Sequence, residues 1–171
     1  MTRSRTVERF AAGVRVAACL VALGALTAAV AGCGDVSKAL PDVQLPSLDG
    51  DGADLDIDAL TGPAVVNVWA TWCQPCVIEL PEFQAVSEQF PSIRFIGVDA
   101  SGSDDDQESI RFLADLGVTY EQLTDRNGEL SAGLEITELP ATVVVDASGE
   151  VALIHQGRLT RDELIRELVD L

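Results

Sequence analysis

Cys73 and Cys76, separated by two residues, are the side chains of this chain best suited to carry out chemistry. A disulfide between them would close too small a loop to restrict the unfolded chain much, so it would do little to stabilise a fold. Gln74 and Pro75, which lie between them, carry no charge. The spacing therefore indicates either redox chemistry or metal binding.

The residues around the two cysteines predict a strand followed by a helix. Residues 64–69 form a β-rich run suited to a central strand, and residues 73–90 follow as a helical stretch. Cys73, which we expect to be exposed at the helix start, would meet free backbone N–H groups and the positive end of the helix dipole, and both favour a thiolate. We therefore expect Cys73 to be the nucleophile and Cys76, one turn later, to attack the mixed disulfide. Pro75 suits the first helical turn, where no N–H is needed.

Strand and helix patterns also alternate along the rest of the chain. Strands are expected at 93–99, 140–146 and 151–155, a helix ending at Gly117, a less regular stretch at 118–139, and a last helix after the capping box 160–163. The last helix is expected to turn Leu164, Leu168 and Leu171 inward. Residues 43–45 and 54–55 predict a short hairpin near the N-terminus. This order predicts an α/β domain with a mixed central sheet between two layers of helices.

Charge is distributed unevenly along the 171 residues, whose net charge is −17 at pH 7. Residues 1–32 hold four Arg and one Glu, which leaves 7 basic and 27 acidic residues, a net of −20, in the other 139. This balance argues against nucleic acid as a partner, because phosphate binding depends on clustered Lys and Arg. A hydrophobic content of 47% indicates a folded globular domain.

The N-terminal segment has the pattern of an export signal. Four arginines precede an apolar run at residues 16–31, which is short for a membrane span and typical of a signal peptide. Val30-Ala31-Gly32-Cys33 resembles a bacterial lipobox, which implies a signal peptide at 1–32, lipid on Cys33 and a tether at 33–41. An uncleaved anchor and ordinary cleavage near the same point are the alternatives. All three place the remaining chain outside the cytoplasm.

Two segments of the chain together resemble a known family. Residues 66–76 read VNVWATWCQPC and are followed by Glu79-Leu80-Pro81, and residues 139–142 read LPAT. These segments are similar to the active-site segment and the cis-proline loop of the thioredoxin superfamily, with most similarity to its membrane-tethered TlpA/ResA-like branch. The resemblance extends over about residues 41–171. It implies a thioredoxin-like three-layer α/β/α domain at 42–171, with a short N-terminal β extension.

The same resemblance implies the activity and the partners. It implies a membrane-anchored thiol-disulfide oxidoreductase that acts on cysteines of client proteins, in some relatives apocytochrome c, and that draws electrons from a membrane thiol donor. No cofactor is expected.

The resemblance also assigns roles around the cysteines. Trp72 is expected to shape the docking surface, and a cis-Pro140 to expose the backbone of Leu139 to a client peptide. Soluble thioredoxins have a buried Asp six residues before the first cysteine, and here that position is Asn67. Glu79 is then the carboxylate left near the site. It is either partly buried and coupled to the thiols or an ordinary solvated helix residue.

Other functions on this fold remain as alternatives. A copper carrier would resemble CxxxC with a distal His, and a zinc site would lack its usual four ligands. A thiol peroxidase would have Pro-x-x-x-Thr/Ser-x-x-Cys, whereas positions 66 and 70 are Val and Ala. Haem attachment needs a His where Val77 stands, and His155 is expected to be an ordinary strand residue. The aspartates of residues 49–58 do not match an EF-hand and predict a solvated turn rather than a metal site.

Overall fold

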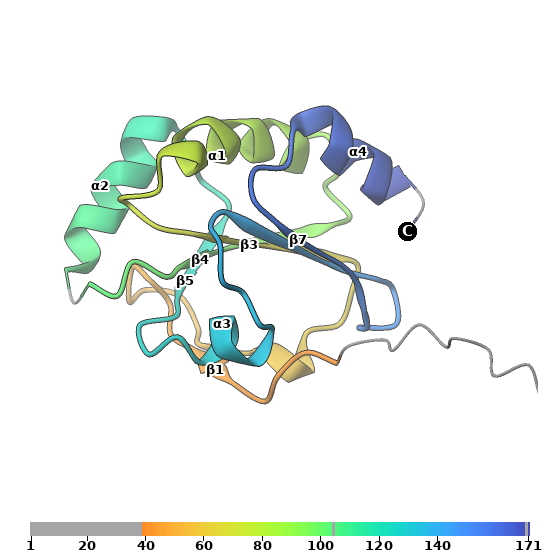
Figure 1. The fold of residues 1–171 in the computed structure, drawn as a ribbon, viewed down its shortest axis with the longest axis horizontal. Coiled ribbons are helices and arrows are strands. Elements are labelled where there is room, and N and C mark those ends of the chain that lie inside the picture. The colour runs from red at the N-terminus through yellow and green to blue at the C-terminus, as the bar shows by residue number, and fades with distance from the viewer. Residues whose placement is uncertain (1–38, 104, 170) are drawn as a thin grey trace, which may run out of the picture. The chain divides into compact units, whose positions relative to one another are not determined.

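Five strands form one mixed sheet in the order β5-β4-β3-β6-β7 (Figure 1). The computed structural model describes residues 39–103, 105–169 and 171. The strands of this sheet are β3 (Ala64–Trp69), β4 (Arg94–Asp99), β5 (Glu121–Thr124), β6 (Ala141–Val145) and β7 (Val151–Gln156). Strands β3, β4 and β5 run parallel to one another, whereas β6 and β7 pair antiparallel. The mixed sheet expected from the sequence is therefore confirmed.

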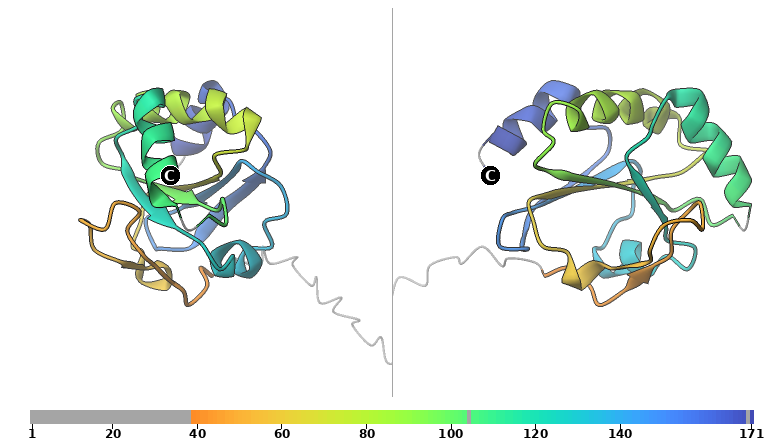
Figure 2. Two further views of the ribbon diagram at one scale, coloured as in Figure 1. Left: turned by 90° about the vertical axis from the view of Figure 1, so that its left-hand side faces the viewer. Right: turned by 180° about the vertical axis from the view of Figure 1, so that it is seen from behind.

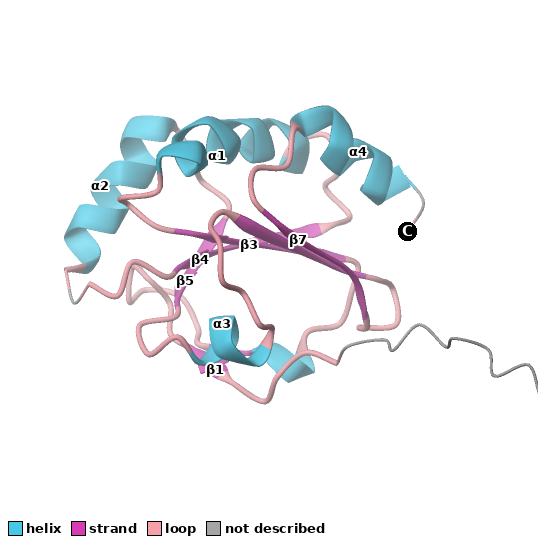
Figure 3. Ribbon diagram, in the orientation of Figure 1, coloured by secondary structure: helices cyan, strands magenta, loops and turns pink. Residues whose placement is uncertain are grey.

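Helices cover both faces of the sheet and make three layers (Figures 1 and 3). One face carries α1 (Gln74–Ser87), α2 (Asp106–Leu116) and α4 (Arg161–Val169). The other face carries α3 (Glu129–Gly133), the 3-10 helix η1 (Ile57–Ala59) and the short strands β1 (Gln44–Leu45) and β2 (Leu55–Asp56), as the turned views of Figure 2 also show.

Central strand β3 is buried on both faces, which explains why five of its six residues are apolar; the sixth, Asn67, is polar and also buried. Successive side chains of a strand point to opposite faces. Val66 and Val68 therefore pack into the core under α3, whereas Val65 packs under α1 and α4. Trp69 lies fully buried beneath α1 and α2, where its ring stacks on Phe112 at a centroid distance of 5.5 Å. This rigid strand leads directly into the segment that carries the two cysteines.

The N-terminal lead-in pairs as expected, with Leu45 opposite Leu55 in the antiparallel pair of β1 and β2. Beyond it, the backbone N–H of Leu48 donates to Gln122 O (3.0 Å) and so covers the edge strand β5. Leu40, in the segment expected to be a tether, is buried in the core under α3. The expected signal peptide, Cys33 and the rest of that tether up to residue 38 lie outside the described residues. Within the described residues, no helix is both long enough and apolar enough to cross a membrane.

The helix ends follow the local sequence signals. Asp105 caps α2 by accepting a 3.1 Å hydrogen bond from Gln107 N, and Gly117 ends it in the left-handed conformation (φ 69°). Thr160 N donates to the Glu163 carboxylate (2.9 Å), which completes the expected capping box of α4. The expected inward position of Leu171 is wrong: it lies beyond the end of α4 and is 38% exposed.

Candidate active site

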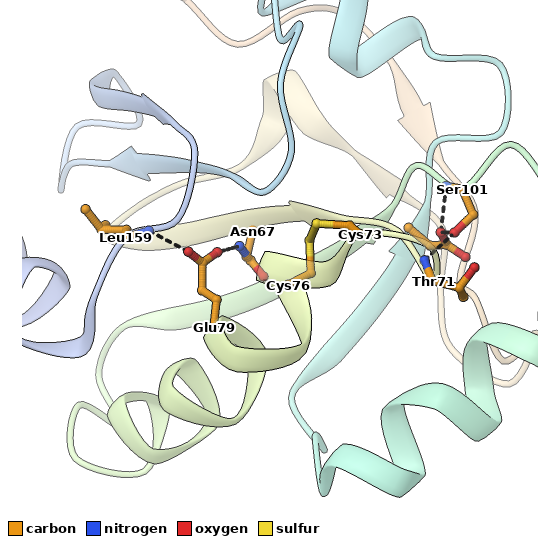
Figure 4. Close-up of a disulfide and its surroundings, with 8 residues drawn as sticks. Asn67, Thr71, Cys73, Cys76, Glu79, Ser101 and Leu159 are labelled. Carbon is orange, nitrogen blue, oxygen red and sulfur yellow. Dashed lines mark hydrogen bonds between the residues drawn. A yellow bond between two sulfur atoms is a disulfide. The ribbon is translucent and has the colours of Figure 1, made fainter.

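Cys73 and Cys76 form a disulfide (S–S 2.02 Å) at the N-terminus of α1 (Figure 4). Cys73 is the N-cap residue, and Gln74 and Pro75 are the first two helical residues. Ala70 O accepts a 3.1 Å hydrogen bond from Cys73 N, so the turn after β3 fixes where the helix begins. A reduced thiol at this N-cap position would lie at the positive end of the helix dipole, which lowers the pKa of a thiol.

The exposure of the two cysteines differs from the expectation. Cys73 was expected to be exposed, but only 3% of it is accessible in the disulfide form, against 0% of Cys76. The reason is that both belong to a packed cluster with Trp69 and Leu80. Trp72 is by contrast 64% exposed, so the surface beside the disulfide is a large aromatic side chain.

Glu79 is fully buried one helical turn after Cys76, on the same side of α1. Its Oε1 accepts a hydrogen bond from Asn67 Nδ2 (2.8 Å) and its Oε2 accepts one from Leu159 N (2.6 Å), as Figure 4 shows. Burial raises the pKa of Glu79 to about 7, although both hydrogen bonds and the positive charge of Arg158 lower it. The interpretation of Glu79 as a solvated helix residue is therefore wrong.

The surroundings of Glu79 hold further buried polar atoms. Asn67 Oδ1 and Thr142 Oγ1, whose residues are register neighbours on β3 and β6, have no hydrogen-bond partner among the described residues. The same holds for the hydroxyl of Tyr120, whose pKa is raised by burial and by the charge of Glu79. Unpaired buried polar atoms cost stability and are rare in native proteins. Asn67 is the residue that donates to Glu79, and Thr142 is its register neighbour, so two of the three unpaired atoms belong to the residues around the buried carboxylate.

The fold brings the Leu139–Pro140 segment to the active-site loop. Trp72 and Leu139, 67 positions apart in the sequence, both line one groove of about 370 Å³, together with Ile136 and Glu138. The Leu139–Pro140 peptide bond is cis, as the sequence predicts, and Pro140 is buried while Leu139 is half-buried. Within the part of the chain that the structure describes, the backbone of Leu139 takes part in no hydrogen bond. Its N–H and carbonyl are therefore left unpaired at the edge of the groove.

Ser101, which the sequence analysis did not single out, holds the active-site loop in place. Its hydroxyl accepts a 3.0 Å hydrogen bond from Thr71 N, and its carbonyl accepts one from Trp72 Nε1 (3.4 Å). The buried carboxylate of Asp99, at the end of β4, in turn accepts hydrogen bonds from the N–H (2.7 Å) and the hydroxyl of Ser101. A polar residue at the carboxyl end of a central strand was the signal that could have indicated this contact.

Among the described residues, no group of three or more His, Cys, Asp or Glu side chains could hold a metal ion. Asp49 belongs to the run of aspartates after the first strand, and its Oδ1 accepts hydrogen bonds from Ser47 Oγ (2.7 Å), Asp51 N (3.0 Å) and Gly52 N (3.2 Å). That carboxylate therefore closes a turn. His155 lies on β7, opposite Thr142 on β6.

Comparison with known proteins agrees with this geometry. A model of the AhpC/TSA family matches residues 36–154, which include the disulfide, Glu79 and the Leu139–Pro140 peptide. Thiol:disulfide interchange protein DsbE of Escherichia coli is 35% identical over 127 residues, 72% of this chain and 66% of DsbE. Thiol-disulfide oxidoreductase ResA of Oceanobacillus iheyensis is 30% identical over 141 residues, 80% of this chain and 72% of ResA. The structure of MTB dsbF in its mixed oxidized and reduced forms is similar with a TM-score of 0.69 at 33% identity, covering 77% of this chain and 96% of that one.

Proposed function

The chain belongs to the AhpC/TSA family of thioredoxin-like proteins and is a thiol-disulfide oxidoreductase, and from this premise we propose that it reduces disulfide bonds of client proteins outside the cytoplasm. The observation that carries the proposal is the Cys73–Cys76 disulfide at the N-terminus of α1, beside the exposed Trp72 and one helical turn from a buried carboxylate. This arrangement supplies a nucleophile, a second thiol to release the client and a group that holds a proton.

Reduction of a client takes two thiol-disulfide exchanges. The Cys73 thiolate attacks one sulfur of the client disulfide, which forms a mixed disulfide and releases the other client sulfur as a thiolate. The Cys76 thiolate then attacks Sγ of Cys73, so the Cys73–Cys76 disulfide forms and the second client sulfur leaves. The client gains two electrons and two protons. A thiol donor, which we place in the membrane, reduces the protein's disulfide before the next cycle.

Glu79 is the group that we assign to proton handling and to tuning the thiols. A carboxyl whose pKa is about 7 exchanges its proton at neutral pH, whereas an ordinary glutamate is already ionised there. Because Cys76 and Glu79 lie one turn apart on the same side of α1, the charge of the carboxylate opposes the charge of a thiolate at Cys76. Asn67, which donates to Glu79, helps to hold the carboxylate in that position.

Client docking is assigned to the groove between the active-site loop and the Leu139–Pro140 segment. The free backbone of Leu139 offers strand-like pairing to an extended peptide, and the exposed Trp72 offers an apolar surface beside the sulfur atoms. Pro140 supports this geometry because it fixes its own φ angle and has no N–H to compete for the client. Gln74 and Pro75 complete the motif at the first helical turn.

The direction of electron flow that we propose is from this protein to the client. Gln74 and Pro75 bring no positive charge to the thiols, and the Glu79 carboxylate brings a negative one. Both features destabilise a thiolate relative to the disulfide, so the dithiol gives up its electrons readily. Apocytochrome c, which the resemblance to TlpA/ResA-like proteins implies as a client class, is one client to test.

For localisation, we propose a lipoprotein held at the membrane by lipid on Cys33. The support is the sequence pattern of arginines, an apolar run and Val30-Ala31-Gly32-Cys33. The domain core includes Leu40, so only a few residues separate it from Cys33. Such a short connection would keep the active site close to the membrane surface and to a membrane thiol donor.

The proposed activity can be tested by counting thiols. The reduced protein is mixed anaerobically with a synthetic peptide that contains a Cys-Xaa-Xaa-Cys disulfide, and both products are alkylated and weighed by mass spectrometry. We expect one peptide disulfide to be reduced for each Cys73–Cys76 disulfide that forms. Cys73→Ser should not reduce the peptide. Faster oxidation of the protein by hydrogen peroxide than by the peptide would support a peroxidase instead. Protection of both thiols by an equivalent of copper or zinc would support a metal carrier.

A further inference from the structure

Gln156, the last residue of β7, binds the segment that leads to Leu139 and Pro140. Its side-chain oxygen accepts hydrogen bonds from Thr137 N (2.8 Å), Thr137 Oγ1 (3.1 Å) and Glu138 N (3.1 Å). Its side-chain nitrogen donates to the backbone carbonyl of Glu135 (3.1 Å). One exposed amide thus makes four contacts with a segment about 20 residues away in the sequence.

These contacts are the main support of Thr137 and Glu138, which line the groove beside Leu139. Ile136 is the last residue before them whose backbone N–H bonds to α3: it donates to Ser131 O (2.8 Å). Among the described residues, the backbone N–H groups of Thr137 and Glu138 have no partner other than Gln156. On the far side of Leu139, Gly157 N donates to Pro140 O (2.8 Å). Gln156, at the end of β7, and Gly157, the residue after it, therefore hold the chain on both sides of Leu139.

We propose that Gln156 is a positioning residue that fixes the backbone of Leu139 in the conformation that a client peptide pairs with. The inference rests on the proposed function, because it assumes that clients bind along Leu139. Thr137 and Glu138 are exposed, so water can replace the amide of Gln156 without unfolding the domain. The cost of losing these bonds would then appear in client binding, since the segment must be ordered each time a client docks.

The test compares Gln156→Met, which keeps the length of the side chain and removes all four hydrogen bonds, with the wild type. Single-turnover reduction of the Cys-Xaa-Xaa-Cys peptide, measured over a range of peptide concentrations, separates half-saturation from the limiting rate. We expect the half-saturating concentration to rise about tenfold in Gln156→Met, with the limiting rate nearly unchanged. Gln156→Glu keeps an acceptor for Thr137 and Glu138, so its half-saturating concentration should lie between those of the wild type and Gln156→Met.

Two readouts that do not involve the client exclude a general effect on the fold. The rate at which dithiothreitol reduces Cys73–Cys76 and the equilibrium potential of that disulfide should stay at their wild-type values in Gln156→Met. Gln89→Met is the matched control, because Gln89 is an exposed amide in the turn after α1, and its Nε2 donates to Ala85 O in the last turn of that helix. It should leave peptide half-saturation unchanged.

Trp72→Ala separates a failure of this inference from a failure of the proposed docking surface. If Trp72→Ala weakens peptide binding and Gln156→Met does not, the role assigned to Gln156 is wrong and the docking surface stands. If neither variant changes half-saturation, clients do not bind along this groove, and both ideas are overturned. Equal losses of peptide and dithiothreitol rates in Gln156→Met would show damage to the active site and would also contradict positioning.

Discussion

Asn67 Nδ2 donates a 2.8 Å hydrogen bond to Glu79 Oε1 in the buried interior between β3 and α1. The second carboxylate oxygen accepts from Leu159 N, just before α4, so one acidic side chain connects the central strand, the active-site helix and the segment leading to the last helix. Asn67 stands at the position of the buried Asp of soluble thioredoxins, and its amide donates to the carboxylate of Glu79 on the neighbouring helix. In this protein the ionisable group of the pair lies on α1, the helix that carries Cys76.

The first prediction follows from the burial of this carboxylate. The pKa of Glu79 rises from its ordinary value of 4.5 to about 7 in the folded protein. Between these two values the folded state holds a proton that the unfolded state has released, so the free energy of unfolding falls as the pH rises. The contribution of Glu79 to the free energy of unfolding is fully present below pH 4.5 and is lost as the pH rises through 7. We expect a loss of up to roughly 3 kcal/mol across this window.

Urea unfolding of the disulfide form at a series of pH values measures this effect. Glu79→Gln should lack the loss, so its stability relative to the wild type should improve steadily from pH 4.5 to pH 7.5. Glu88→Gln, at the exposed end of the same helix, is the matched control and should follow the wild type. Parallel pH profiles for wild type and Glu79→Gln would mean that the buried carboxyl does not change its protonation in this range.

The second prediction concerns the two cysteines. Cys73 keeps 3% of its surface accessible and Cys76 none, so a client sulfur can approach Cys73 alone without unfolding of α1. Cys76→Ser should therefore accumulate a mixed disulfide with the client peptide, while Cys73→Ser should form none. Non-reducing gels and mass spectrometry after acid quenching detect the adduct. Equal trapping by both variants would contradict this division of roles.

The third prediction concerns attachment to the membrane. If Cys33 carries lipid, Cys33→Ala should move the protein from the detergent phase to the soluble fraction after cell lysis and phase partition. The activity of the purified domain toward the Cys-Xaa-Xaa-Cys peptide should not change. Ser37→Ala, a small substitution in the same expected tether, should leave the distribution as it is. Continued membrane retention of Cys33→Ala would support an uncleaved signal anchor.

Local signals predicted much of this fold. The strand-forming run of β3, the end of α2 at the left-handed Gly117 and the capping box at Thr160 each depend on neighbours within a few positions, and each is present as expected. The cysteine pair at a helix start is equally local, because the positions of Cys73 and Pro75 follow from helix geometry alone.

Contacts between distant segments could not be predicted in the same way. Strand β5 (Glu121–Thr124) has only two buried residues, and α3 (Glu129–Gly133) has one, so neither shows a periodic pattern. The start of α3 is held instead by the Asp125 carboxylate, which accepts from Leu130 N (3.1 Å) and Ser131 N (2.9 Å). The hydrogen bonds of Gln156 with Thr137 and Glu138 also join distant segments. No motif in the sequence around Gln156 predicts them.

The last prediction concerns the redox potential. Strong oxidants of this kind depend on an unusually acidic thiol that stabilises the reduced form, and here Gln74-Pro75 adds no positive charge while Glu79 adds a negative one. We expect a potential nearer to the roughly −270 mV of thioredoxin than to the roughly −120 mV of a strong periplasmic oxidant. Equilibration with glutathione buffers measures it, and a value above about −160 mV, toward the oxidant end of that scale, would contradict the proposed direction of electron flow.

Glu79→Gln tests the cause of that potential as well as its value. Removing the negative charge should lower the pKa of the thiols and make the protein more oxidising, by about 30 mV for each tenfold change in the equilibrium constant. Because the pKa of Glu79 is about 7, the carboxyl is mostly neutral below pH 6 and ionised at pH 8. The difference between Glu79→Gln and the wild type should therefore be small at pH 6 and clear at pH 8. A difference that is the same at both pH values, or absent at both, would show that the charge of Glu79 does not tune the cysteines.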